Sequence, residues 1–111
     1  MNNKKNEENK FSFSINYADS EIKSIATVIV KGSYICKTEN STDTNDIIIN
    51  SLKSSIVEYI NLNDIKKLNR LQSEKNDIIN YAINKIKIHG IELTKIKIDS
   101  IDYDDETKNC K

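Results

Sequence analysis

Residues 84–101, NKIKIHGIELTKIKIDSI, decide the fold because the apolar period changes there at a single glycine. Before Gly90, apolar residues recur three and four positions apart, which is the period of an amphipathic helix. After Gly90 they alternate with polar residues, which is the period of a strand. Glycine adopts the left-handed conformation that ends many helices without steric cost. We therefore predict a helix that ends at His89-Gly90 and a strand that begins at Ile91.

The strand after this glycine changes its inward face partway along. Its apolar residues have one parity before Thr94 and Lys95 and the opposite parity after them. An extra residue in one strand of an antiparallel pair, a β-bulge, shifts parity in this way. We therefore predict a bulge near these two residues. The apolar residues concerned are Ile91, Leu93, Ile96 and Ile98.

Two helices are predicted upstream, each with one apolar stripe at a period of about 3.6 residues. The first covers residues 45–60, where the polar linker 38–46 ends. The second is expected to begin near Asn69, because Gln72 follows it at the spacing of a capping box. The predicted inward residues are Ile48, Leu52, Ile56, Tyr59 and Ile60 in the first helix, Ile65 and Leu68 in a short helical turn over residues 61–68, and Ile78, Ile79, Ala82, Ile83 and Ile86 in the second helix.

Two strands are predicted before the helices. Residues 11–17, FSFSINY, alternate apolar and polar side chains, and residues 22–37 continue the β pattern after a turn at residues 18–21. Gly32 interrupts the second strand, and a glycine inside a strand marks a bulge or a close backbone approach. One face of the second strand is expected to carry Ala26, Val28, Val30, Tyr34 and Cys36, and the other face Thr27, Ile29, Lys31, Ser33 and Ile35.

Three short motifs occur in an order that resembles a known family. They are Lys31-Gly32-Ser33-Tyr34 in a strand, Leu62-Asn63-Asp64-Ile65 between the helices, and Gly90-Ile91-Glu92-Leu93-Thr94 at the start of the last strand. Over about residues 22–103, the chain resembles the latter half of the SPFH domain, also called the band 7 domain, of stomatins, prohibitins and flotillins. Typical members add a β-rich half and a membrane anchor before this part, and many add a coiled coil after it. The resemblance implies a fold and an assembly role. The sheet is expected to be smaller than in typical members, because only residues 11–17 could supply part of the β-rich half.

These elements predict an α+β fold, with a small antiparallel or mixed sheet packed against two main helices in an SPFH-like manner. One domain is expected over residues 11–103, because a chain of 111 residues supports a single core. Residues 1–10 contain no apolar side chain after Met1 and are predicted to be a disordered tail. Residues 104–111 are predicted to be a polar tail.

Charge and cysteine content exclude several classes of function. The 17 basic and 17 acidic residues give a formal charge of zero, so no net field attracts nucleic acid. The longest apolar run, residues 25–30, is far shorter than the roughly 20 residues that span a bilayer. The polar N-terminus lacks the pattern of a secretory signal, and Cys36 and Cys110 are expected to be free thiols. We expect a cytoplasmic protein that meets membranes only peripherally or through a partner.

No residue pattern indicates catalysis, a cofactor or a metal site. His89, the one histidine, has no serine, cysteine or carboxylate at a triad spacing, and we interpret it as structural. Cys36 is expected to pack inward as a small apolar side chain. A zinc site has too few ligands, since no CxxC or HxxxH pair occurs. The acidic residues Asp102, Asp104, Asp105 and Glu106 lack the glycine and the bidentate glutamate that complete a calcium loop.

The remaining surface indicates interactions with proteins. A small sheet leaves edge strands whose unpaired N–H and C=O groups pair with other chains, and residues 25–30 form an uncharged β window between Lys23 and Lys31. We therefore expect a non-enzymatic interaction or assembly module that binds a protein partner or self-associates through sheet edges. One alternative is a small ligand-binding α+β protein, although no small-molecule substrate is evident. The other is a peripheral membrane adaptor that binds anionic lipid through Lys85, Lys87, Lys95 and Lys97, although interleaved acidic residues favour a solvated face.

Overall fold

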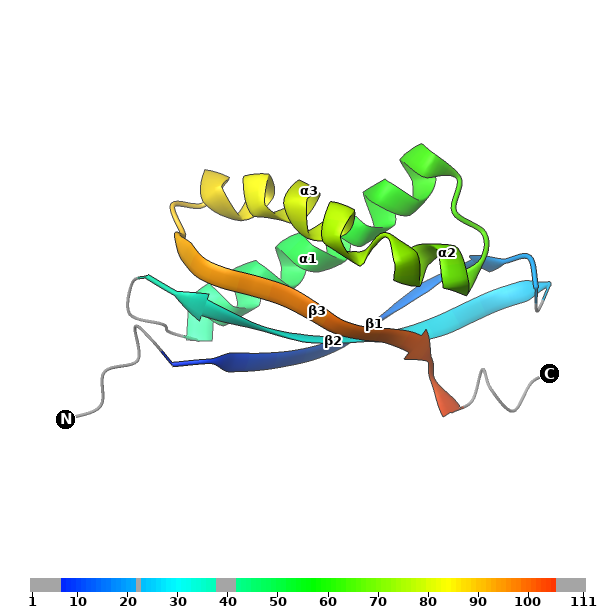
Figure 1. The fold of residues 1–111 in the computed structure, drawn as a ribbon, viewed down its shortest axis with the longest axis horizontal. Coiled ribbons are helices and arrows are strands. Elements are labelled where there is room, and N and C mark those ends of the chain that lie inside the picture. Colours follow the sequence, from blue (N-terminus) through cyan, green and yellow to red (C-terminus); the bar gives the residue numbers. More distant parts are fainter. Residues whose placement is uncertain (1–6, 22, 38–41, 106–111) are drawn as a thin grey trace.

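The computed structural model describes residues 7–21, 23–37 and 42–105. Its elements are β1 (Asn9–Asp19), β2 (Ser24–Cys36), α1 (Thr42–Asn63), α2 (Leu68–Ser73), α3 (Lys75–Ile88) and β3 (Leu93–Tyr103). The strands form one antiparallel sheet in the order β1-β2-β3, and the helices lie together on one of its faces (Figure 1). The predicted α+β class is confirmed, and the sheet is antiparallel, with α1 and α3 as the two main helices.

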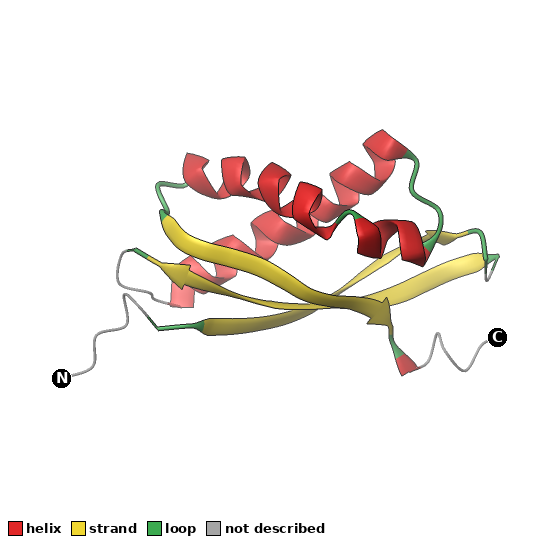
Figure 2. Ribbon diagram, in the orientation of Figure 1, coloured by secondary structure: helices red, strands yellow, loops and turns green. Residues whose placement is uncertain are grey.

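Side-chain alternation along β1 and β2 decides which face of the sheet is buried. The apolar residues predicted to alternate in β1 are buried, and the polar residues between them are exposed. In β2 the predicted inward face is buried as well, so both interpretations are confirmed. No described helix covers the opposite face of the sheet (Figure 2). The buried residues are Phe11, Phe13, Ile15 and Tyr17 in β1, and Ala26, Val28, Val30, Tyr34 and Cys36 in β2.

The main helices bury the predicted stripes, but α1 exceeds its predicted bounds. It covers residues 42–63 rather than 45–60. Residues 42–46, predicted as the end of the polar linker, are therefore helical instead. Asp43 lies in the first turn, where the helix dipole favours a carboxylate. The rest of the predicted linker, residues 38–41, lies outside the described residues. Two members of the predicted stripes are half-buried, namely Tyr59 and Ile83.

The predicted capping box at Asn69 and Gln72 is wrong. Helix α2 begins one residue earlier, at Leu68, and its N-cap residue Lys67 makes no side-chain capping bond. The Gln72 side chain instead donates to the main-chain carbonyl of Ile101 at 2.7 Å. Because this amide makes a tertiary contact, it does not close a local cap. The predicted second helix is therefore two helices, α2 and α3.

Asp64 ends α1 in a left-handed backbone conformation, with a φ of 49°. The next amide, that of Ile65, donates to the carbonyl of Ile60 at 3.0 Å, which is the long hydrogen bond of a Schellman motif. Ile65 is fully buried and Ile60 nearly so, and such an apolar contact accompanies this motif. The segment after α1 is thereby fixed against the core. The predicted inward positions of Ile65 and Leu68 are confirmed, but residues 65–67 are not helical, so the predicted helical turn is wrong there.

Replacing Asp64 with glycine is expected to raise the free energy of unfolding by about 0.5 kcal/mol, because glycine adopts the left-handed conformation without steric cost. Asn63→Gly, one residue earlier and within the helix, is the matched control and is expected to lower it. Urea unfolding followed by circular dichroism measures both changes. A glycine at residue 64 that destabilises the protein would contradict this account of the helix end.

The turn from α3 into β3 passes through Gly90, whose φ is 78°. Its amide donates to the Lys87 carbonyl at 2.9 Å, so the predicted glycine stop is confirmed. The following strand starts at Leu93, two residues later than predicted.

The predicted bulge in β3 is confirmed at Thr94. Ile35 of β2 pairs with Lys95, but the next residue, Cys36, pairs with Leu93. Thr94 is therefore the extra residue between two successive pairs. Its insertion explains why the inward parity changes there.

A second bulge lies opposite Gly32. Lys31 pairs with Ser100 and Gly32 with Ile98, so Asp99 is left over in β3. The predicted irregularity at Gly32 is confirmed, although the extra residue belongs to the neighbouring strand.

The ends of the chain differ from prediction where they are described. β1 begins at Asn9 and runs through Asp19, so the predictions of a tail to residue 10 and a turn from residue 18 are wrong at these positions. The parts of the predicted tails at residues 1–6 and 106–111 lie outside the described residues. Within the described part of the chain, no helix is both long and apolar enough to cross a bilayer.

Candidate functional site

The outer edge of β1 presents main-chain groups to the outside. In β2, the carbonyl of Thr27 accepts from the amide of Asp104 at 2.9 Å, so the odd-numbered residues of β2 direct their main-chain groups toward β3. The even-numbered residues then face β1, because the two directions alternate along a strand. Even residues of β2 pair with odd residues of β1, so the even residues of β1 direct their groups away from the sheet. These residues are Lys10, Ser12, Ser14, Asn16 and Ala18.

Nothing in the described residues closes this edge. Between residues 10 and 18, no main-chain hydrogen bond joins β1 to a described group outside β2. β1 contains no proline, no glycine and no bulge, and Lys10 is the one charged side chain among its even residues. Edge strands usually use such features to avoid pairing with another chain. β1 is therefore a regular edge of 11 residues that is open to a further strand.

The other edge of the sheet, β3, is closed in several ways. Its two bulges interrupt the pairing surface. The Gln72 side chain donates to the Ile101 carbonyl at 2.7 Å, and Lys75 Nζ donates to the Asp99 carbonyl at 3.4 Å. Helix side chains thus occupy main-chain acceptors of this strand. The contrast identifies β1 as the edge at which a strand can be added.

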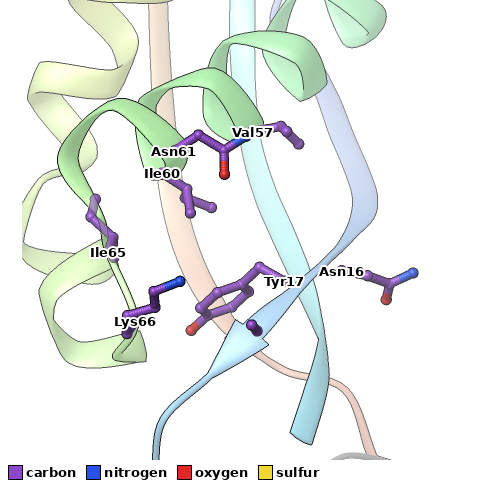
Figure 3. Close-up of a pocket in the computed structure, with 8 residues that line it drawn as sticks. Asn16, Tyr17, Val57, Ile60, Asn61, Ile65 and Lys66 are labelled. Carbon is purple, nitrogen blue, oxygen red and sulfur yellow. The ribbon is translucent and has the colours of Figure 1, made fainter.

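A pocket of about 130 Å³ opens between α1 and the end of β1 (Figure 3). Val57, on α1, remains 41% exposed beside it. The volume suits one side chain, because pockets for small molecules usually measure about 300–1,000 Å³. In strand addition, such a pocket selects a side chain of the incoming strand. The lining residues are Asn16, Tyr17, Ala18, Val57, Ile60, Asn61, Ile65 and Lys66.

Two lysine side chains near this edge already have interaction partners. Lys66, which lines the pocket, pairs with Asp64 at 3.5 Å. The Nζ atom of Lys53 lies 5.9 Å from the centroid of the Phe13 ring, within the range of a cation–π contact. The edge therefore does not present a strong field to an incoming strand.

A buried acidic residue joins the two edge strands beside the pocket. Asp19 is 2% exposed, and it accepts hydrogen bonds from the Tyr103 hydroxyl at 2.6 Å, the Tyr17 hydroxyl at 3.2 Å and the Glu21 amide at 2.8 Å. Burial first, and then Asp19, raises the pKa of both tyrosine hydroxyls. Hydroxyls in this state donate hydrogen bonds and do not act as bases near neutral pH. The cluster therefore ties β1 to β3 across the end of the sheet.

The residues singled out for chemistry lie apart from one another. His89 is the C-cap residue of α3 and borders an open hollow of about 390 Å³ beside α1. Cys36 is fully buried and unpaired, and burial raises the pKa of its thiol. The predicted inward packing of Cys36 is confirmed, whereas Cys110 lies outside the described residues.

The predicted basic cluster is divided between two faces of the protein. Lys85 projects from α3 and pairs with Glu58 of α1. Lys95 and Lys97 alternate with residues of β3 that pack on the core, so they point to the face without helices. Lys97 also pairs with Asp99 at 3.4 Å. Lys85, Lys95 and Lys97 therefore do not form one continuous patch.

The described acidic residues at the end of β3 lie beside an open hollow. Asp102, Asp104 and Asp105 border an open hollow of about 390 Å³ together with Lys31, and Glu106 lies outside the described residues. Among the residues that the structure describes, no three histidine, cysteine or acidic side chains are grouped to hold a metal ion.

The uncharged window at residues 25–30 is not an edge. It lies in β2, the central strand, with β1 on one side and β3 on the other. Pairing with another chain was expected here if the window lay exposed, and this condition is not met, since its main-chain groups are used within the sheet. The available edge is β1.

Comparisons with known proteins identify no relative. No protein-family model, no curated protein and no solved structure matches the chain. The resemblance to the SPFH domain therefore stays a prediction, and function has to be inferred from the geometry of the sheet edge.

Proposed function

We propose that this protein is a non-enzymatic interaction module that binds protein partners by adding a strand at the outer edge of β1. The observation that carries the proposal is a regular edge, with outward main-chain groups at alternate residues, beside a pocket of about 130 Å³. In strand addition, main-chain hydrogen bonds supply affinity and pockets for alternate side chains supply specificity. Both parts of such a site occur together at β1.

The assembly role, the SPFH resemblance and the location belong to the same proposal. The order of elements from β2 to β3, with helices between two strands, supports the resemblance. Pairing at a free edge offers a route to assembly that needs no coiled coil. We propose the cytoplasm as the location, because Cys36 is a thiol without a disulfide among the described residues, which suits a reducing compartment.

Selection of displayed peptides on the immobilised chain tests this site. Short random peptides that bind the wild type are expected to alternate apolar and polar residues, and to bind Ser14→Pro about tenfold more weakly or worse. Proline at residue 14 removes an outward amide and puts its ring in the path of the incoming strand. The bonds to β2 come from the odd residues, so they remain.

Ser14→Ala is the matched control, because it keeps the amide and removes only the hydroxyl. Its affinity for the selected peptides is expected to equal that of the wild type. Circular dichroism first establishes that Ser14→Pro is folded, and Ser12→Pro, whose amide also points outward, replaces it if it is not. Peptides that bind Ser14→Pro as well as the wild type, or a selection that enriches none on a chain that light scattering shows to be monomeric, would overturn the proposal.

A further inference from the structure

We infer that the strand added at β1 is β1 of a second copy of this chain, paired antiparallel about a two-fold axis at Ser14. This inference rests on the proposed function, to which it adds the partner and the register. It follows from the spacing of the outward groups, from the side chains that the register brings together and from the charge of the chain.

One antiparallel register uses every outward-facing residue of β1. Centred on Ser14, it pairs Ser14 with Ser14, Ser12 with Asn16, and Lys10 with Ala18 of the other copy. A shift of two residues leaves outward groups at the strand end unpaired. A shift of one residue sets outward groups against residues whose groups are bonded to β2. The length and phase of β1 therefore select this register.

Side chains match on both faces of the sheet in this register. On the helix-covered face, Phe11 of one copy lies opposite Tyr17 of the other, and Phe13 lies opposite Ile15. Aromatic and β-branched residues stabilise antiparallel strands as cross-strand pairs. On the other face, Ser14 meets Ser14 and Ser12 meets Asn16, while Lys10 lies opposite Ala18. No like charges face each other, because Lys10 is the one charged residue of the outward set.

The register also connects the strand edge to the pocket. Tyr17 lines the pocket, so its cross-strand neighbour, Phe11 of the second copy, comes to the pocket mouth. Val57, exposed at that mouth, gains an apolar neighbour. The formal charge of zero means that no net repulsion keeps two copies apart.

Pairing in this way closes on itself. The two-fold axis is perpendicular to the sheet, so each copy uses its β1 edge for the other and a continuous sheet of six strands results from three in each copy. The remaining edges are β3, which bulges and helix side chains close. The expected product is therefore a dimer and not a fibre.

Cysteine crosslinking tests both the partner and the register. In a chain with Cys110→Ser, Ser14→Cys is expected to form a disulfide between copies, because residue 14 faces itself across the axis. Ser12→Cys alone is expected not to, since its two copies lie farther apart than the roughly 7 Å limit between Cα atoms of a disulfide. Ser12→Cys mixed with Asn16→Cys is expected to crosslink. Cys36 is buried and does not compete.

Light scattering across a concentration series measures the same association without a crosslink. The mass is expected to rise from that of one chain, 12.7 kDa, toward twice that value, and Ser14→Pro is expected to weaken the association by about tenfold or more while Ser14→Ala does not. A Ser12→Cys chain that crosslinks as readily as Ser14→Cys would overturn the register. A wild-type mass that stays at one chain at all concentrations would overturn the second copy as partner.

These outcomes separate the inference from the proposed function. A monomeric chain that binds selected peptides, and loses them in Ser14→Pro, keeps strand addition at β1 but assigns it to a foreign strand. A dimer that persists in folded Ser14→Pro places the contact between copies elsewhere and overturns the inference. Peptides that bind folded Ser14→Pro unchanged overturn the proposed function itself.

Discussion

Alanine in place of Gly32 is expected to lower the free energy of unfolding by about 4 kcal/mol. A β-carbon at this residue would overlap the main-chain carbonyl oxygen of Lys97, and it would lie 2.5 Å from Cζ of Phe11 and 3.0 Å from Cα of Ile98. Two of these atoms belong to the main chain of β3, which cannot rotate aside as a side-chain tip can. β3 therefore has to separate from β2, with loss of hydrogen bonds around the second bulge.

Gly90→Ala is the matched control, because glycine is needed there for a different reason. Gly90 has a φ of 78°, a conformation that L side chains rarely adopt, but a β-carbon built on it meets no atom within 4 Å. Its replacement adds backbone strain and no overlap. The expected loss is about 1 kcal/mol.

Urea unfolding of the wild type and both variants measures the comparison. Adding Phe11→Leu to Gly32→Ala is expected to recover little stability, because the Lys97 carbonyl remains in the way. The close approach of β3 is the wrong explanation if Gly32→Ala loses less stability than Gly90→Ala, or if Phe11→Leu restores most of the loss.

Apolar periodicity predicted most of this fold, because an apolar residue at a regular spacing indicates a position that faces the core. The change of parity at Thr94 located a bulge without any knowledge of the pairing strand. Gly32 indicated a bulge or a close backbone approach, and both occur at this residue. The bulge at Asp99 was not predicted, although the apolar spacing from Ile98 to Ile101 carries the same signal.

Polar residues were harder to predict, because their partners lie far away in the chain. Gln72 fits a capping box by spacing, yet it bonds to Ile101, which follows 29 residues later. Asp19 is of a residue type that is common in turns, but its hydrogen-bond partner Tyr103 lies 84 residues away in the sequence. Local patterns contain no information about such pairs. The burial of an acidic residue at a strand end can therefore be recognised only once the arrangement of the strands in the sheet is known.

Interaction through a sheet edge stays a prediction, and the sequence did not show which strand forms the open edge. The sequence indicated a sheet edge, yet the uncharged window at residues 25–30 lies in the central strand, whose two sides pair with β1 and β3. β1, with its alternating serines, is typical of any half-buried strand. Strand order alone decides which of the two is an edge. Val57 gave no signal either, because a single exposed apolar residue on a helix is ordinary.

Asp19→Ala is expected to lower the free energy of unfolding by about 3–5 kcal/mol, because it leaves the hydroxyls of Tyr17 and Tyr103 and the amide of Glu21 without their acceptor. Each of the two buried hydroxyls left unsatisfied costs about 1–3 kcal/mol. Asp99→Ala is the surface control, since that side chain is 54% exposed, and it is expected to change stability by about 0.5 kcal/mol or less.

A mutant cycle separates the hydrogen bonds from simple loss of packing. Tyr17→Phe with Tyr103→Phe removes both hydroxyls and leaves the buried Asp19 carboxylate with fewer donors, so it is expected to destabilise as well. Adding Asp19→Leu to these two changes removes donors and acceptor together, and the triple variant is expected to be more stable than the sum of the separate losses predicts. Additive losses would show that the cluster does not act as a unit.

The pH dependence of stability gives an independent measure of the same cluster. Burial first, and then Asp19, raises the pKa of Tyr17 and Tyr103 in the folded state, whereas both have pKa values of about 10 in an unfolded chain. A group whose pKa is raised by folding contributes its full stability below its unfolded pKa and loses it as the pH rises further.

The free energy of unfolding of the wild type is therefore expected to fall above about pH 10. The free energy of unfolding of the Tyr17→Phe and Tyr103→Phe double variant is expected to fall less steeply with pH. A hydrogen bond to Glu74, and then burial, raises the pKa of Tyr59 to about 12. Tyr59 therefore adds a fall in stability with pH of the same sign to both proteins. Equal slopes in the two proteins would mean that the buried hydroxyls are not held protonated by the fold.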